Sequence, residues 1–400
     1  MKIALYGIGG TYNYGCDAII RGTERIIHNK FPDAEIDYLS LSFVDDVERL
    51  ADVDVNIINL TAGKVKKFIQ KFIIKLNLLL KQRFFGLLGN AYYRLLVPNI
   101  KKYDYVLSIG GDIYTLPPRN EYVGKKNYTN LLLEFGKYCK RNEVPMIIWG
   151  ASIGPFDDDA YMKDVFLSHI KECAHFIVVR EKKTDQYLLD NGVLNYSLYG
   201  DPAFAIPYDR RGICVENKIG INLSPLSFKY ANNGQTKDEW IEEQAKVLVE
   251  IQKYFGSQIV LIPHVFSQSE NDDDFSYLEK IKNKAEVLGV KVELVKTEGF
   301  VDAKKELSKC KLVISARMHC AINSICCGTP AIFLSYSEKA KGMSEMVYGT
   351  EKFAVSINEF VNKDFIIPFI EKALYTFENI DIEQNAKNIG STSLKAVDIF

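Results

Sequence analysis

The 400-residue chain lacks several features that would each assign it to a particular class of protein. No apolar run reaches the length of a membrane-spanning helix without charged residues inside it, which argues against an integral membrane protein. The eight cysteines include no CxxC pair and no other spacing typical of a metal site, so we expect free thiols in a reducing compartment and no metal. Met1–Tyr6 is too short for the apolar core of a signal peptide, and we therefore expect a cytoplasmic protein.

An excess of charge of either sign is also absent. The 50 basic and 51 acidic residues give a formal charge of −1, so no overall field would attract nucleic acid. A hydrophobic fraction of 47% and a charged fraction of 25% are those of a soluble globular protein. The length allows two domains of ordinary size, each with its own core.

Acidic residues are missing from one long stretch, Val55–Tyr103, which is rich in lysine and arginine. Apolar side chains recur there at helical spacing, and Phe84-Phe85 and Tyr92-Tyr93 follow them. A basic amphipathic helix with flanking aromatics is typical of an interfacial membrane anchor, and on this interpretation residues 61–103 make peripheral contact with the inner face of the membrane. An ordinary helix that covers the sheet, with its lysines in water, explains the pattern equally well.

Short buried strands alternate with helices along the chain, which predicts an α/β protein with two parallel, Rossmann-like sheets. Ile3–Tyr6 is the first strand, and a glycine-rich loop from Gly7 to Asp17 leads from it into a helix. The glycine spacing is not GxGxxG, so a dinucleotide site is weakly supported. We expect further strands at 35–41, 53–60, 105–109, 145–149, 176–179 and 198–200, then at 219–223, 259–262, 290–295, 312–314 and 331–334.

An exposed stretch at residues 207–217 reads as a linker between the domains. We therefore expect an N-terminal α/β domain at 1–206 and a C-terminal α/β domain at 218–375. The tail, 376–400, is predicted to be helical and to cross back to the first domain. Two such domains in tandem imply a cleft between them.

The most informative stretch is Lys311–Met343. Arg317 and His319 come directly after a buried strand and before a small-residue helix, which Gly328-Thr329-Pro330 ends. Free N–H groups at a helix N-terminus and the planar fork of arginine together favour an anion. Taken alone, an Arg-x-His pair after a strand is more often a cap or a surface pair.

Polar residues also follow other predicted strands, and the carboxyl ends of parallel strands meet at one edge of a sheet. The further candidates for the site are Gly10, Asn13, Asp17, Asp112, Arg180, Ser224, His264 and Lys339. Some have plain alternatives: a salt bridge to Glu181 or another carboxylate for Arg180, and an Asx turn that caps the helix for Asp17. His264, taken alone, is also explained as a capping or surface residue.

The Arg-x-His before a small-residue helix and a Gly-x-Pro turn resembles the characteristic segment of the polysaccharide pyruvyl transferase family. Asn13-x-Gly15-x-Asp17 looks like the N-terminal signature of that family, and the loop Gly150–Phe156 is also similar to its pattern. The resemblance implies a GT-B-like fold. It also implies that the N-terminal domain takes the acceptor and the C-terminal domain takes phosphoenolpyruvate.

The reaction that this resemblance implies moves an enolpyruvyl-derived unit from phosphoenolpyruvate to two hydroxyls of a sugar. A pyruvate ketal forms on a cell-surface polysaccharide or its lipid-linked precursor, and phosphate is released. His319 would be the acid, because imidazole titrates near neutral pH. Arg317 and Arg180 would hold the carboxylate and the phosphate, with Lys339 as a lesser anion contact. Asp17 or Asp112 would accept the sugar proton or bind the sugar, and no cofactor is expected beyond the donor substrate.

A second function remains open at this point. A GT-B glycosyltransferase that uses a nucleotide sugar would place its diphosphate at a helix N-terminus with Arg317 equally well. A scaffold that only binds sugar or membrane is disfavoured, because polar residues gather at several strand ends.

Overall fold

The computed structural model describes residues 1–61, 72, 75–76, 85–117, 119, 122–123, 128–230, 234–335 and 338–400. The chain divides into two compact units. Unit 1 contains Met1–Thr11, Ile19–Asp201 and Leu394–Phe400, and unit 2 contains Tyr12–Ala18 and Pro202–Ser393.

Unit 1 is built on a parallel sheet of seven strands in the order β3-β2-β1-β4-β5-β6-β7. The central strands are buried on both faces, which explains why they read as unbroken apolar runs in the sequence. In β1, Ile3 lies opposite Ile36 on one side and Tyr105 on the other. The strands are β1 (Lys2–Tyr6), β2 (Glu35–Ser40), β3 (Asn56–Asn59), β4 (Tyr105–Ile109), β5 (Met146–Ala151), β6 (Ala174–Val179) and β7 (Tyr196–Leu198).

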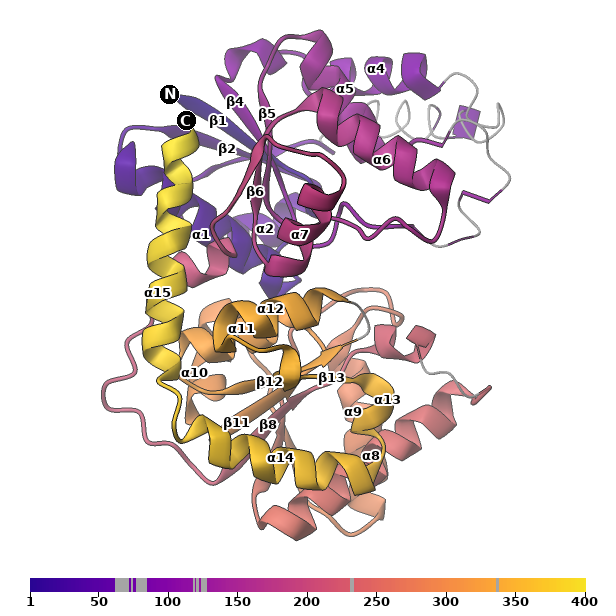
Figure 1. Cartoon of the computed structure of the whole chain (residues 1–400), viewed down its shortest axis with the longest axis vertical. Helices are drawn as coiled ribbons and strands as arrows, with labels where there is room; N and C mark the ends of the chain where they lie inside the picture. The colour runs from indigo at the N-terminus through magenta and orange to yellow at the C-terminus, as the bar shows by residue number, and fades with distance from the viewer. Residues whose placement is uncertain are drawn as a thin grey trace. The chain divides into compact units, whose positions relative to one another are not determined.

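Helices pack against both faces of this sheet (Figure 1). They are α1 (Tyr14–Lys30), α2 (Phe43–Arg49), α4 (Phe85–Leu96), α5 (Leu131–Arg141), α6 (Ala160–Cys173) and α7 (Lys182–Asp190), with a 3₁₀ turn at Ile100–Lys102. The two ends of the chain lie near each other in this unit (Figure 1). The Phe400 ring packs on Tyr105 of β4, Trp149 of β5 and Phe31, with centroid separations of 5.0, 5.8 and 6.4 Å.

Unit 2 repeats the plan with six parallel strands in the order β10-β9-β8-β11-β12-β13. Leu312, Val313 and Ile314 of β11 have no exposed surface, as expected for a central parallel strand. The strands are β8 (Lys218–Asn222), β9 (Gln258–Leu261), β10 (Val292–Leu294), β11 (Leu312–Ser315), β12 (Ala331–Ser335) and β13 (Ala354–Ser356).

The helices of unit 2 have clear start signals in the sequence. α8 (Lys237–Phe255) begins with a capping box between Thr236 and Glu239 and ends at Gly256, whose φ is 59°. The others are α9 (Asp274–Val287), α10 (Phe300–Lys309), α11 (Met318–Cys326), α12 (Glu338–Tyr348), α13 (Ile357–Phe360), α14 (Lys363–Phe377) and α15 (Ile382–Leu394). Short 3₁₀ turns lie at Pro202–Ala205, Pro225–Tyr230 and Glu351–Phe353, and Lys395–Ile399 forms one more in the tail.

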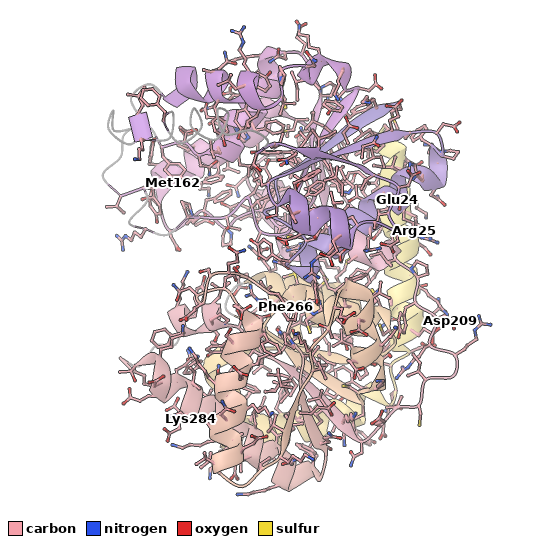
Figure 2. The ribbon with its side chains drawn as sticks, turned by 180° about the vertical axis from the view of Figure 1, so that it is seen from behind. Glu24, Arg25, Met162, Asp209, Phe266 and Lys284 are labelled. Atoms are coloured by element: carbon pink, nitrogen blue, oxygen red, sulfur yellow. The ribbon has the colours of Figure 1, made fainter. Side chains whose placement is uncertain are left out.

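The segment Tyr12–Ala18 groups with unit 2, although it follows β1 of unit 1 directly in the chain. Asn13 forms an antiparallel bridge with Val265, and the Tyr14 N–H donates to the His264 carbonyl at 3.0 Å. The N–H of Phe266, on the loop after β9 (Figure 2), donates to the Tyr12 carbonyl at 3.0 Å. The sequence predicts that residues 12–18 belong to a domain at 1–206, whereas these bonds join them to unit 2. Local sequence could not show this, because backbone pairing between distant segments leaves no mark on it.

The prediction of a membrane anchor at residues 61–103 falls largely outside the described residues. In its described part, Tyr92 and Tyr93 are buried in the core of unit 1, so the prediction that they flank an interfacial helix is wrong. The Tyr93 hydroxyl donates to the Leu131 carbonyl at 2.6 Å, and Lys102 pairs with buried Asp37 at 2.9 Å. Within the described ranges, no helix has the length and apolar character that a membrane crossing would require.

Candidate functional site

Arg317 and His319 stand where β11 gives way to α11, as the sequence predicts. Arg317 is the N-cap residue of α11, with an extended backbone, and His319 is the second residue of the helix. Both side chains are partly buried. The first turn of α11 therefore offers its N–H groups and positive dipole end beside these two residues.

The guanidinium of Arg317 is held by two aspartates. Nε and Nη2 donate to Asp274 Oδ1 at 3.1 and 2.9 Å, and Nη2 also donates to Asp272 Oδ1 at 2.7 Å. The sequence predicts an anion contact for Arg317, and the described geometry already gives it carboxylate partners. Such forked, charge-assisted bonds fix the orientation of the guanidinium.

Asp274 is the centre of this cluster. Its Oδ2 accepts from the N–H groups of His264 and Val265 at 3.1 and 3.2 Å and from Asn222 Nδ2 at 3.2 Å. Burial raises the pKa of Asp274, and the charge of Arg317 and these donors oppose that shift. Asn222, at the end of β8, also accepts from the Arg317 N–H at 3.0 Å. One carboxylate thus ties together the residues that follow β8, β9 and β11.

His319 lies against the first turn of α1. A Cβ placed on Gly15 would be 2.5 Å from His319 Nδ1, closer than real Cβ contacts allow. The Asn13 side chain accepts a hydrogen bond from the Gly15 N–H at 2.9 Å, which fixes the turn. The Asn-x-Gly-x-Asp sequence therefore requires glycine at position 15, because any larger residue would collide with the imidazole of His319.

A second imidazole, His264, is fully buried near the first. Its Nε2 lies 2.8 Å from Nδ2 of Asn323, which is one turn after His319 on α11. Burial lowers the pKa of His264 to about 3, and the charges of His319 and Arg317 act in the same direction. His264 is therefore neutral near pH 7, and its Nε2 accepts from the amide. The sequence predicts a ligand contact for His264, but its side chain is buried and is hydrogen-bonded to Asn323.

Unit 1 builds a comparable cluster around Arg180, which follows β6. Nη1 donates to Asp201 Oδ2, Nη2 to Asp112 Oδ1 and Nε to Ser152 Oγ, each at 2.8 Å. Burial lowers the pKa of Arg180, but the carboxylates of Asp201 and Asp112 outweigh it and the net shift is upward. The four residues follow β4, β5, β6 and β7, so one edge of the sheet assembles them.

The predicted alternative for Arg180, a salt bridge, is present in this structure with other partners than Glu181. Glu181 is the N-cap of α7, and its carboxylate accepts from the N–H groups of Lys183 and Thr184 at 2.7 and 3.1 Å. A Cβ on Gly111 would lie 2.5 Å from Arg180 Nη1. The glycine turn after β4 is thus needed for the approach of the guanidinium.

The remaining predicted residues lie in structural turns or in the interior. Gly10 is buried next to Thr11, whose N–H and hydroxyl both donate to Asp46 of α2 at 2.8 Å. Ser224 Oγ accepts from the Leu226 N–H at 3.2 Å, inside a 3₁₀ turn. Asp17 and Lys339 are buried in the first turns of α1 and α12.

Sequence reasoning missed the partners of both arginines. The structure adds Asp201, Ser152, Asp272, Asp274, Asn222 and Asn323. Asp201, Ser152 and Asn222 follow or end strands, so the signal that selected Arg180 was available for them as well. Asp272 and Asp274 lie at the start of α9, and Asn323 lies within α11. Only the assembled sheets show which of these residues meet.

These two doubly wound parallel units define a GT-B-like α/β protein. UDP-GlcNAc 2-epimerase from Methanocaldococcus jannaschii superposes with a TM-score of 0.57 over 100% of this chain and 99% of its own, at 13% identity. Anabaena HepE gives a TM-score of 0.56 over 100% of this chain and 97% of its own, at 12% identity. At such identities the likeness concerns the fold alone.

The sequence model for polysaccharide pyruvyl transferase matches residues 13–338, and the chain belongs to that family. The amylovoran biosynthesis protein AmsJ of Erwinia amylovora is 24% identical over 95% of this chain and 94% of its own length. The matched region includes the segment Asn13–Asp17, the arginine clusters of both units and His319. The described residues include no group of three or more His, Cys, Asp or Glu side chains that could hold a metal ion.

Proposed function

We propose that the protein transfers a pyruvate ketal group from phosphoenolpyruvate to a sugar of a cell-surface polysaccharide or of its lipid-linked precursor. The observation that carries this proposal is the position of His319, at the N-terminus of α11 and against Gly15. In the proposed mechanism, the imidazole of this Arg-x-His is the proton donor, and the guanidinium of Arg317 beside it is held by two aspartates. The name of the relative AmsJ, a biosynthesis protein for amylovoran, supports a polysaccharide as the destination.

The reaction requires one proton donor and one proton acceptor. His319 gives a proton to the methylene carbon of phosphoenolpyruvate, and the oxocarbenium-like centre at C2 is attacked by a sugar hydroxyl. The C2–O bond to phosphate then breaks, and a second hydroxyl closes the ketal. The two hydroxyl protons balance the proton on the new methyl group and the proton on the released phosphate.

The side chains around His319 restrict how it acts. Arg317 and its aspartates fix the start of α11, and Gly15 sets the distance between the imidazole and the turn of α1. The carboxylate and phosphate of the donor require cations, and the candidates are Arg317 and Lys339 in unit 2 and Arg180 in unit 1. Asp17 and Asp112 are the candidates for accepting the proton of the sugar hydroxyl.

A glycosyltransferase that uses a nucleotide sugar is the second candidate. HepE is described in complex with UDP and glucose, and it shares the fold over the whole chain. A helix N-terminus with an arginine would suit a diphosphate as well as it suits phosphoenolpyruvate.

Two measurements separate the candidates. Thermal unfolding is followed with phosphoenolpyruvate and with UDP; at about a hundred times the dissociation constant, the true ligand should add about 2.7 kcal/mol to the free energy of unfolding. In parallel, the full chain is incubated with phosphoenolpyruvate and a panel of free and lipid-linked saccharides. Acceptor-dependent phosphate release, with a new ketal methyl signal, supports the proposal. Stabilisation by UDP alone would favour glycosyl transfer.

A further inference from the structure

Each of the two arginines pairs with two aspartates that differ in their exposure to solvent. In unit 1, the side chain of Arg180 is 1% exposed, and its partners differ sharply: Asp201 is 0% exposed and Asp112 is 52% exposed. Both donor–acceptor distances are 2.8 Å. The outer carboxylate of Asp112 therefore covers the guanidinium on a side that solvent reaches.

Unit 2 shows the same arrangement with other elements. Arg317 is 12% exposed, and it lies between Asp274, which is 0% exposed, and Asp272, which is 35% exposed. The inner aspartate belongs to α9, and the outer one lies on the loop before it. The pattern of one arginine, one inner carboxylate and one outer carboxylate is thus present in both units.

In each cluster, one guanidinium faces two carboxylates. An incoming anion is repelled as long as the outer carboxylate stays in place. Breaking the bond to a solvent-exposed carboxylate costs little, whereas removing a buried partner leaves an uncompensated charge. The outer aspartate is the partner that can leave.

We propose that Asp112 in unit 1 and Asp272 in unit 2 are resident counter-ions, each displaced from its own arginine, Arg180 or Arg317, by an anionic group that binds at that arginine. At each arginine, an incoming carboxylate or phosphate group takes over the bond that the aspartate makes to Nη2. The aspartate then turns into solvent, and the inner carboxylates keep both guanidinium groups fixed. The identity of the anion as phosphoenolpyruvate rests on the proposed function, but the displacement does not.

The test measures binding of inorganic phosphate and of phosphoenolpyruvate to the full-length chain by calorimetry. Asp112→Asn and Asp272→Asn remove the outer charge while keeping the shape of the side chain. Each should lower the dissociation constant for inorganic phosphate by about threefold to tenfold, since a like charge a few ångströms from the anion is lost. Asp112→Glu and Asp272→Glu keep the charge and should not reach that affinity.

Matched controls remove the same charge elsewhere. Asp157 pairs with Lys163 on the surface of unit 1, and Asp209, on an exposed loop of unit 2 (Figure 2), pairs with Arg211. Asp157→Asn and Asp209→Asn should leave phosphate binding unchanged. Equal tightening in these controls would mean that net charge alone is responsible, and it would overturn the proposal.

The remaining outcomes are equally decisive. Unchanged or weaker phosphate binding in both Asp112→Asn and Asp272→Asn overturns displacement, because the aspartates would then not compete with the anion. If phosphate binding tightens while no variant binds phosphoenolpyruvate, the counter-ion role stands and the proposed pyruvyl transfer fails.

Discussion

Each unit holds one arginine between two aspartates, but the residues that follow the arginine differ between the units. In unit 1, Arg180 follows β6 and α7 begins two residues later, at Lys182; in unit 2, Arg317 precedes α11 and His319 lies at the corresponding spacing. Both arginines are held by an inner and an outer aspartate. A lysine keeps its charge at neutral pH, whereas a histidine exchanges its proton there. This difference leads us to expect the proton donor of the proposed reaction in unit 2, at His319, and a fixed positive charge at the matching position of unit 1.

The largest effects should come from the inner aspartates. Asp201→Asn and Asp274→Asn each leave a buried guanidinium without its main counter-charge, and we expect each to lower the free energy of unfolding by about 3–5 kcal/mol. The outer variants Asp112→Asn and Asp272→Asn should cost about 1 kcal/mol or less. Urea unfolding of the four variants measures both values. Similar costs for inner and outer variants would remove the distinction between them.

The next largest effect separates the two units. His319→Gln keeps a hydrogen-bonding side chain but cannot deliver a proton, so turnover should fall by about a hundredfold or more while donor binding changes little. The matched variant at the same spacing in unit 1, Lys182→Gln, should retain most of its turnover. Equal losses in both variants would contradict the assignment of proton transfer to unit 2.

Smaller effects should follow from the two glycines that make room for His319 and Arg180. Gly15→Ala and Gly111→Ala each place a Cβ 2.5 Å from a ring or guanidinium nitrogen, and overpacking of this kind costs about 1–3 kcal/mol. We expect Gly15→Ala to lower kcat, because His319 must move, and Gly111→Ala to raise the KM for the donor, because Arg180 must move. Gly299→Ala is the control, since its Cβ meets nothing within 4 Å. The reverse division of kcat and KM would refute these roles.

Each unit also buries one neutral histidine. Burial lowers the pKa of His169 in unit 1 and of His264 in unit 2 to about 3, against 6.5 in an exposed histidine. Unfolding therefore takes up protons, so stability is full above pH 6.5 and falls as the pH decreases towards 3. The slope should reach about 1.4 kcal/mol per pH unit for each histidine.

Urea unfolding between pH 7 and 5 measures this slope. His169→Phe and His264→Gln should each remove the part of the slope that the substituted histidine contributes. An unchanged slope in either variant would show that its imidazole does not contribute.

The smallest effect concerns the basic segment at residues 61–103, which belongs to the sequence of unit 1 and is longer than any acid-free stretch in the sequence of unit 2. If it binds anionic membrane, each lysine near the surface contributes about 1 kcal/mol. Co-sedimentation with anionic vesicles should then weaken with salt and with substitution of Lys64, Lys66 and Lys67 by glutamine. Equal pelleting with neutral vesicles would exclude an electrostatic anchor.

Much of the architecture was predictable, because buried parallel strands have an unmistakable local composition. The apolar run Leu312–Ile314 and the small-residue helix after it predicted β11 and α11, and with them the position of Arg317 and His319. The same reasoning could not choose between an anion and a carboxylate as the partner of Arg180, since both fit a strand end. Tyr92 and Tyr93 misled the interpretation of the basic segment, because a buried tyrosine and an interfacial tyrosine have the same sequence pattern.

The sequence by itself determined two α/β sheets, the family and the polar residues at the ends of the strands, because each of these depends on short-range patterns of apolar and polar side chains. Only the tertiary structure decided which of these polar residues form hydrogen bonds and ion pairs with one another. Asp274 reaches Arg317 across 43 residues of chain, and Gly15 accommodates His319 although α1 and α11 lie far apart in the sequence. Tyr12–Ala18 joins unit 2 through backbone bonds to Val265 and His264. Charge balance, burial and close approach are properties of such long-range contacts, and no local pattern encodes them.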